Sequence, residues 1–266
     1  MKVAYETIEG INVAYAVNDG GLERGRPTLL CIHGSGGDHH VWSAQFEGLG
    51  NRYNIVALDL PGHGRSEGEG DRTIACSVSR VRNLVEGLGL ERPVVTGHSL
   101  GAAVALSYGL EHGGDAAAVI AVGGGAVMPV SPMVFEGIRG DYSSFIAFAP
   151  ELALAKENRE SLRDILIEGF SRVPPDVLYN DFQACDGFDI TNDLHRIEIP
   201  VLVICGDADK MMPPRFSRFL HESISGSCLS ILPGCGHFPM LEDPAAFNAA
   251  VTEFVEDISR GLSGRG

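Results

Sequence analysis

A serine flanked by glycines follows an apolar run in the middle of the chain. The run PVVT at residues 93–96 leads directly into GHSLG at residues 97–101, which has the spacing G-x-S-x-G around Ser99. At a strand-to-helix junction this spacing forms a sharp turn that exposes the serine hydroxyl and has no room for larger side chains two residues away. An ordinary glycine-rich turn with an incidental serine is the alternative, and the junction disfavours it. We therefore predict that Ser99 is a nucleophile.

A serine hydroxyl is a weak nucleophile and needs a neighbouring base. Of the nine histidines, His237 follows the last strand-like run in the segment GCGHFP, where two glycines and a proline restrict a loop. We predict that His237 is this base. His98 adjoins Ser99, but consecutive side chains diverge at a sharp turn, so His98 is expected to pack or hydrogen-bond locally. Five others lie in polar or helical segments typical of the protein surface: His39, His40, His112, His195 and His221.

The acid that orients the base is expected after an intervening strand, in the chain order serine, acid, histidine. The run VLVIC at residues 201–205 is followed by Gly206 and then by Asp207 and Asp209. The preceding run, AAAVIAV, has no carboxylate after it until Glu136. Position after the strand therefore predicts Asp207 or Asp209 as the acid and leaves the choice between them open.

An oxyanion that develops during acyl transfer needs hydrogen-bond donors. The segment HGSGG at residues 33–37 follows the apolar run TLLCI and offers backbone amides that can face Ser99. We predict that these amides and the amide of Leu100 form an oxyanion hole. A phosphate-binding loop is a weaker interpretation, because the spacing matches no Walker pattern and no lysine follows.

Two kinds of apolar pattern describe the segments that must position these residues. Alternating apolar residues in 3–7 and 11–17 flank a Glu-Gly turn and predict an antiparallel hairpin. From residue 28, short continuous apolar runs alternate with helical patterns, as is typical of strands buried on both faces of a mostly parallel sheet. Helices are predicted to start after Thr73 and Asp243. The runs are TLLCI, NIVAL, PVVTG, AAAVIAV, VLVIC and CLSIL.

The segment from about Met128 to Ile199 lacks strand-like runs and contains short helical patterns rich in Phe, Leu and Met. It is too long for a plain crossover. Because open α/β sheets bind ligands at the carboxyl edge of their strands, we interpret it as a helical cap over that edge. We predict an α/β fold, a mostly parallel eight-stranded twisted sheet with helices on both faces, in which 1–128 and 199–266 form the core and 129–198 the cap. The last eight residues, SRGLSGRG, are expected to be frayed.

Five motifs, in this order, resemble those of the α/β-hydrolase superfamily, and the resemblance covers nearly the whole chain outside the cap. It implies the α/β-hydrolase fold, with Ser99 as the nucleophile and His237 as the base. The family's G-x-x-D spacing implies that Asp209, rather than Asp207, is the acid. The motifs are HGSGG at 33–37, DLPGHGRS at 59–66, GHSLG at 97–101, GDADKMMP at 206–213 and GHFPMLEDP at 236–244.

The same resemblance implies that the amides of Ser35 and Leu100 form the oxyanion hole. It gives the DLPGHGRS loop a structural role through Asp59 and His63. Ala102 stands where many members have a third glycine, and Ser35 where many have a glycine. We expect Ala102 to serve packing. The Ser35 hydroxyl is expected to be an additional donor, as in some capped lyases and carbon-carbon hydrolases of the family.

The composition restricts the partners of the protein. The chain has 35 acidic residues against 20 Lys and Arg, a formal net charge of -15 at pH 7. Such a surface repels phosphates, which disfavours nucleic-acid and membrane partners. Six cysteines without a CxxC pair are expected to be reduced, buried thiols, with a disulfide pair or metal site as the alternative. Because the N-terminus has no apolar signal core, we predict a cytoplasmic location. We expect the protein to be a monomer or a homodimer.

These features predict a serine hydrolase without cofactor or metal that cleaves a small-molecule ester or related acyl substrate through an acyl-enzyme, with carboxylesterase as the leading hypothesis. Enol-lactonase, thioesterase, carbon-carbon bond hydrolase and hydroxynitrile lyase activities use nearly the same motifs and remain alternatives. Ser99 argues against epoxide hydrolases and haloalkane dehalogenases, which use an aspartate nucleophile. A ligand receptor that retains the triad is the non-enzymatic alternative. Seven side chains are expected to line the pocket: Trp42, Met133, Phe135, Phe145, Phe148, Met211 and Phe238.

Overall fold

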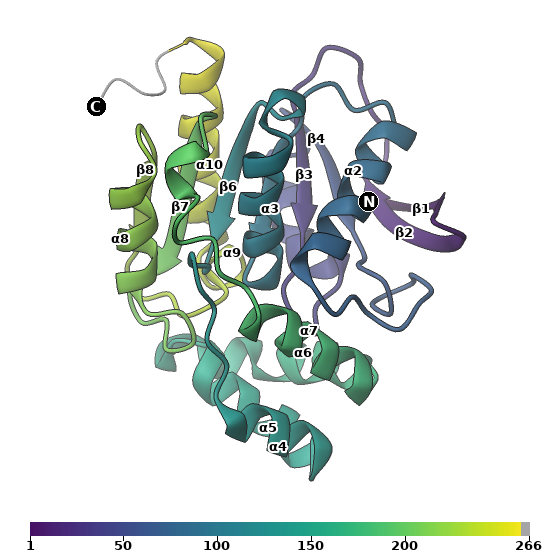
Figure 1. Cartoon of the computed structure of the whole chain (residues 1–266), viewed down its shortest axis with the longest axis vertical. Coiled ribbons are helices and arrows are strands. Elements are labelled where there is room, and N and C mark those ends of the chain that lie inside the picture. The colour runs from purple at the N-terminus through teal and green to yellow at the C-terminus, as the bar shows by residue number, and fades with distance from the viewer. Residues whose placement is uncertain (262–266) are drawn as a thin grey trace.

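A computed structural model describes residues 1–261, and its eight strands form one twisted sheet (Figure 1). The strands are β1 Lys2–Ile8, β2 Ile11–Val17, β3 Thr28–Ile32, β4 Asn54–Leu58, β5 Val94–His98, β6 Ala118–Val122, β7 Val201–Gly206 and β8 Cys228–Leu232. Their order across the sheet is β1-β2-β4-β3-β5-β6-β7-β8. β2 is antiparallel to β1 and β4, and all other neighbours are parallel. The predicted hairpin and mostly parallel sheet are therefore confirmed.

Helices cover both faces of this sheet. Outside the insertion they are α1 Ser43–Leu49, α2 Ile74–Gly87, α3 Leu100–Glu111, α8 Pro214–Ser223, α9 Pro239–Glu242 and α10 Pro244–Ser259. Four single-turn 3₁₀ helices also occur: η1 His39–Trp42, η2 Gly113–Asp115, η3 Lys156–Asn158 and η4 Leu194–Arg196. In Figure 1, α2, α3 and α8 lie in front of the strands and α10 lies behind them.

The predicted helix starts are confirmed by their N-caps. Thr73 Oγ1 accepts a hydrogen bond from the Cys76 amide before α2, and the Asp243 carboxylate accepts one from the Ala246 amide before α10. These bonds satisfy amides that have no partner within the helix. The tail predicted to be frayed starts at the end of α10, and its last residues, 262–266, lie outside the described residues.

Alternate residues of each strand pack into two hydrophobic cores, one on each face of the sheet. In β3, Leu30 and Ile32 belong to the core that includes α2 and α3, whereas Leu29 and Cys31 belong to the core that includes α10. This burial on both faces explains why the strand runs are continuously apolar. Not every cysteine follows the expectation of burial, because Cys76 and Cys228 are exposed.

Four helices between β6 and β7 form a separate layer across the carboxyl ends of the strands (Figure 1). They are α4 Pro132–Arg139, α5 Tyr142–Ala153, α6 Arg159–Ser171 and α7 Pro175–Asp186. An isolated β-bridge between Val127 and Asp189 joins the two ends of this insertion. The insertion thus covers the edge of the sheet where the predicted site residues lie. Within residues 1–261, no helix combines the length and apolar composition that a membrane span requires.

Candidate active site

Ser99 occupies a strained turn between β5 and α3. Its φ of 52° and ψ of -115° are unusual for a residue with a side chain. The flanking glycines are required by close backbone contacts. A Cβ on Gly97 would lie 1.8 Å from the Gly101 carbonyl oxygen, and one on Gly101 would lie 2.3 Å from the Ile32 carbonyl oxygen. The turn therefore has the geometry expected of G-x-S-x-G at a strand-to-helix junction.

His237 and Asp209 form a buried hydrogen-bonded pair at the same edge of the sheet. Asp209 Oδ2 lies 2.8 Å from His237 Nδ1, and Asp209 Oδ1 accepts hydrogen bonds from the amides of Met211 and Met212, both at 2.9 Å. Asp207 is exposed and instead accepts a hydrogen bond from the Gly234 amide. Of the two aspartates that the strand position left open, the structure brings Asp209 against His237.

The hydrogen bonds also assign the tautomer of His237. Because a carboxylate accepts at Nδ1, the ring carries a proton there, and in the neutral ring Nε2 has the free lone pair. Among residues 1–261, this buried Nε2 has no hydrogen-bond partner, the Ser99 hydroxyl included. His237 and Ser99 line the same cavity. The structure thus brings the predicted base and nucleophile to one cavity without a hydrogen bond between them.

His98 supports the His237 loop rather than packing locally as expected. Its Nε2 donates a hydrogen bond of 2.8 Å to the His237 carbonyl oxygen, and the two rings are 4.8 Å apart. Burial lowers the pKa of His98 well below 6.5, so its ring is neutral. Sequence reasoning missed this contact because it joins segments 139 residues apart.

The segment HGSGG, here called the Ser35 loop (residues 33–37), lies directly against the nucleophile. A Cβ on Gly34 would be 2.9 Å from Ser99 Cβ, so the loop backbone can approach Ser99 only at a glycine. Among residues 1–261, the amides of Ser35 and Leu100 have no hydrogen-bond acceptor. Two free N–H groups at this edge can therefore stabilise an oxyanion.

The DLPGHGRS loop (residues 59–66) contributes a buried network of hydrogen bonds around the carboxylate of Asp59. Asp59 accepts hydrogen bonds from the amide and Nδ1 of His39, at 2.7 and 2.8 Å, and from the Arg65 amide at 3.0 Å. Burial opposes ionisation of Asp59, but these hydrogen bonds hold its pKa below 3.8. The expectation that His39 lies at the surface is wrong, because the buried Asp59 carboxylate draws it inside, where it is 1% exposed.

His33, at the start of the Ser35 loop, is held neutral by its contacts. Its Nδ1 donates to the Gly34 carbonyl oxygen at 2.8 Å, and its Nε2 accepts from the Leu60 amide at 2.9 Å. Burial, and next the charge of His63, lower the pKa of His33 to about 4. Protonation of His33 would break the bond from Leu60, so the folded state resists it.

We expect the free energy of unfolding to fall as the pH drops from 6.5 to 4. In this range the unfolded chain binds a proton at His33 that the folded chain does not, which removes up to about 3 kcal/mol of stability. His98 acts in the same direction. The raised pKa of His63 changes stability only above pH 6.5, and the lowered pKa of Asp59 only below 3.8.

Urea unfolding at pH 7 and pH 5 tests this expectation. The free energy of unfolding should differ less between the two pH values for His33→Gln than for the unaltered protein. An unchanged difference would contradict this assignment.

A cavity of about 220 Å³ opens beside Ser99 and His237. Its wall also includes Cys185 and, at one position, the charged Lys210. Most of the remaining wall is apolar and comes from the insertion and from the segments that flank it: Met128, Val130, Val134, Leu152, Phe182 and Met212. The reacting groups thus face a small, mainly apolar space.

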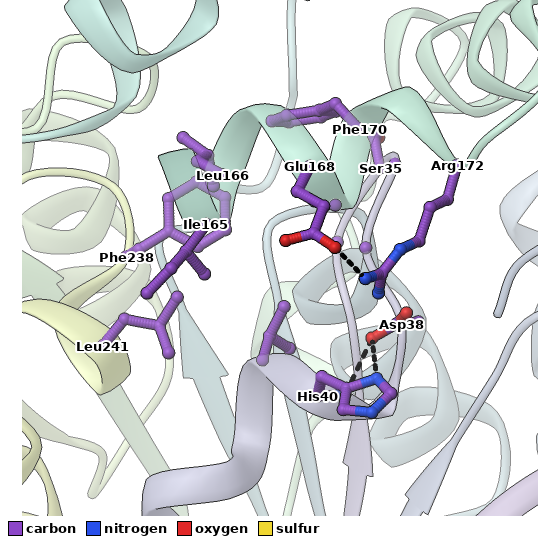
Figure 2. A pocket seen from close by; sticks show the side chains of 15 residues that line it. Ser35, Asp38, His40, Ile165, Leu166, Glu168, Phe170, Arg172, Phe238 and Leu241 are labelled. Atoms are coloured by element: carbon purple, nitrogen blue, oxygen red, sulfur yellow. Dashed lines mark hydrogen bonds and ion pairs between the residues drawn. The ribbon is translucent and has the colours of Figure 1, made fainter. Parts of the chain in front are cut away.

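A second cavity, of about 270 Å³, is lined by the Ser35 loop, by η1 and by α6 (Figure 2). Figure 2 shows Leu166, Ile165, Phe238 and Leu241 at one end. At the other end the Glu168–Arg172 ion pair faces Asp38 and His40. This cavity is therefore apolar towards the His237 loop and charged towards η1.

Of the seven side chains predicted to line the pocket, the structure places one at the cavity beside Ser99 and another at the second cavity. Met211 lines the cavity beside Ser99, and Phe238 lines the second cavity. The other five do not line either cavity. Trp42 is fully buried against Phe247, Met133 and Phe148 are 76% and 57% exposed, Phe135 packs on Tyr179, and Phe145 packs near Gly137. The helices of the insertion need apolar side chains to pack against one another. Composition alone cannot distinguish these side chains from those that line a pocket.

Asp38, His39 and His40 are the residues whose arrangement best suits a metal ion, with ligand atoms within 4.8 Å of one another. One nitrogen of each histidine ring is already engaged in a hydrogen bond. Nδ1 of His39 pairs with Asp59, and Nδ1 of His40 pairs with Asp38 at 3.0 Å. The contacts within the chain therefore account for this group.

Comparison with known proteins agrees with this fold. Residues 29–250 match the alpha/beta hydrolase family. RutD of Caulobacter sp. (strain K31), provisionally named a carbamate hydrolase, is 31% identical over 264 residues, covering 94% of this chain and 97% of RutD. The structure of a thermophilic esterase is similar, with 29% identity and a TM-score of 0.83 over 97% of this chain and 98% of the esterase. An enol-lactonase from Burkholderia xenovorans LB400 has the same fold, with 22% identity and a TM-score of 0.88 over 95% of this chain and 100% of its own. The protein belongs to the alpha/beta hydrolase family.

Proposed function

We propose that this protein is a serine carboxylesterase that cleaves small, largely apolar esters with Ser99, His237 and Asp209. The observation that carries the proposal is the buried Asp209–His237 pair, because His237 and Ser99 line the same cavity and His237 Nε2 has no other hydrogen-bond partner among residues 1–261. The similarity to a thermophilic esterase supports an ester as the substrate. In this proposal, residues 129–198 are the cap that closes over the substrate.

The proposed reaction has two steps. Ser99 Oγ attacks the ester carbonyl carbon while His237 Nε2 takes the hydroxyl proton, and the amides of Ser35 and Leu100 bind the oxyanion. Collapse of this intermediate expels the alcohol, which receives the proton from His237, and leaves an acyl-enzyme. A water molecule then attacks the acyl group, His237 takes its proton, and the carboxylic acid leaves as Ser99 regains a proton.

The size and lining of the cavity favour a small acyl group. Its volume of about 220 Å³ is below the roughly 300–1,000 Å³ of pockets that bind drug-sized ligands. Met128, Val134 and Leu152 offer no hydrogen bonds to a polar chain. A short aliphatic acyl group can bury its surface there while its carbonyl lies near Ser99.

A panel of p-nitrophenyl esters of increasing acyl length, run beside a lactone and a vinylogous diketone, tests the proposal. We expect the highest kcat/KM for short acyl chains. Phe182→Ala enlarges the cavity and is expected to change the ratio of kcat/KM between longer and shorter esters by about 10-fold or more. Phe148→Ala, at an exposed position of the same insertion, is the matched control and should leave the ratio unchanged.

Two results would contradict the proposal. Cleavage of the diketone or the lactone with esters left intact would assign a different reaction to the same residues. An equal shift in chain-length preference for Phe182→Ala and Phe148→Ala would show that the cavity beside Ser99 does not hold the acyl group.

A further inference from the structure

One face of helix α7 in the insertion contacts the Ser35 loop. Leu178, Asp181 and Cys185 recur at spacings of three and four residues, so they share this face. A Cβ on Gly36 would lie 3.0 Å from Leu178 Cδ1, and Ser35 Oγ is 3.9 Å from Cys185 Sγ. All three α7 side chains are buried. The insertion is therefore packed directly on the loop that offers the Ser35 amide.

Of these three α7 side chains, Asp181 is the one that can carry a charge. Its Oδ2 accepts a hydrogen bond of 3.0 Å from the Gly36 amide and lies 2.9 Å from His63 Nε2. The side chain is 4% exposed. The carboxylate therefore joins three segments that are far apart in the sequence: α7, the Ser35 loop and the DLPGHGRS loop.

The hydrogen bonds determine the charges of this pair. His63 Nδ1 lies 3.0 Å from the Pro61 carbonyl oxygen, while Nε2 lies against the Asp181 carboxylate. Both partners only accept hydrogen bonds, so both ring nitrogens carry protons and His63 is a cation. Although burial lowers the pKa of His63, the charge and hydrogen bond of Asp181 raise it above 6.5. The buried Asp181 side chain is thus paired with the His63 ring in the interior.

Two consecutive peptide groups of the Ser35 loop are held in place. The Gly34 carbonyl oxygen accepts hydrogen bonds from the Gly37 amide at 3.0 Å and from His33 Nδ1 at 2.8 Å. In a trans peptide the N–H points opposite to the carbonyl, so the Ser35 N–H points away from these donors. The next peptide is held by the bond from Gly36 to Asp181. The direction of the free Ser35 N–H therefore depends on the hydrogen bonds of the Gly34 carbonyl oxygen on one side and of the Gly36 amide on the other.

We propose that Asp181 is a positioning residue, which holds the Ser35–Gly36 peptide from the insertion and so keeps the Ser35 amide aimed at the oxyanion. This inference rests on the proposed esterase function. Asp181 acts through the loop and does not touch the reacting atoms. The hydrogen bond from the Ser35 amide to the substrate oxygen is strongest in the transition state, when negative charge develops on that oxygen. Misplacement of this amide should therefore lower kcat more than it raises KM.

Asp181→Leu tests this role because leucine has a similar size and removes the oxygen that accepts the Gly36 amide, whereas asparagine would keep an acceptor there. We expect kcat to fall by about 10², the lower end of what loss of one oxyanion donor costs, with KM within about threefold. Asp176→Leu is the matched control, because it makes the same change at an exposed position of the same helix. Its kcat and KM should be unchanged. Circular dichroism and thermal melting check that each variant is folded.

A second measurement does not depend on activity. In protein labelled with ¹⁵N-glycine, the Gly36 amide should exchange slowly with deuterium in the unaltered protein and at least about 10-fold faster in Asp181→Leu. His63→Gln retains Asp181 and a donor for it, so it should keep most of this protection. Asp181→Ala removes the same acceptor and serves as the second variant if Asp181→Leu does not fold.

The outcomes separate the two proposals. If the unaltered protein hydrolyses esters and Asp181→Leu has an unchanged kcat, or only a raised KM, the positioning role is wrong and the esterase function stands. If the unaltered protein neither hydrolyses esters nor reacts with a phosphonate, the esterase function is wrong. In that case unchanged exchange of the Gly36 amide in Asp181→Leu would also overturn the role of Asp181 in holding the loop.

Discussion

Ser99→Ala is expected to lower kcat for ester hydrolysis by about 10⁶, the size of loss that follows removal of the nucleophile in a serine protease. The variant retains the Asp209–His237 pair and the free amides of Ser35 and Leu100, but no oxygen remains to form the acyl-enzyme. Steady-state kinetics on the best p-nitrophenyl ester measure this loss. Incubation with a fluorophosphonate adds a direct assay, because the strained turn presents Oγ to the base and should make it reactive.

The matched control for Ser99→Ala is Ser107→Ala, which removes a buried hydroxyl from the same helix α3. Ser107→Ala should hydrolyse esters and take up one phosphonate, as judged by intact mass. Ser99→Ala should take up none. Equal adducts on both variants, or ester hydrolysis retained in Ser99→Ala, would show that the nucleophile is elsewhere.

Asp209→Asn is expected to lower kcat by about 10⁴ without unfolding the protein. The asparagine carbonyl oxygen can still accept hydrogen bonds from the amides of Met211 and Met212. The asparagine NH₂ group then faces His237 Nδ1. Nδ1 must then accept a hydrogen bond, so the ring proton moves to Nε2. A protonated Nε2 cannot take the proton from Ser99, and the base is lost.

Asp207→Asn is the control for this effect, because it makes the same chemical change two residues away. Asp207 is exposed and bonds to the Gly234 amide, a bond that asparagine can retain. We expect its kcat to change by less than about threefold. If the two variants exchanged these outcomes, Asp207 would be the acid. If neither lost activity, His237 would not need an orienting carboxylate and the triad would lack its third member.

The comparison of Asp207 with Asp209 illustrates what local pattern can and cannot resolve. Both aspartates follow the same strand at nearly the same distance, so position alone left the choice open, and only the family's G-x-x-D spacing favoured Asp209. In the structure, two amides just beyond β7 turn the Asp209 carboxylate inward. The direction of a side chain in a loop is set by such contacts, which no strand pattern encodes.

His39 and Asp181 show where sequence reasoning stops. His39 lies in a polar segment, and Asp181 in DFQACD resembles any surface carboxylate of a helix. Their partners, Asp59 and His63, are 20 and 118 residues away. No local signal links the members of these pairs. A buried histidine or carboxylate can be recognised only once the chain has brought its counter-charge next to it.

The sequence by itself determined the strands, the main helix starts, the turn at Ser99 and the location of the helical insertion. These features depend on periodicity, N-capping and the steric demands of glycine, all of which act over a few residues. Only the tertiary structure decided which aspartate meets His237, which side chains line the cavity beside Ser99 and what holds the Ser35 loop. Each of these depends on where distant segments meet when the two faces of the sheet are buried, and that is a property of the packed chain as a whole.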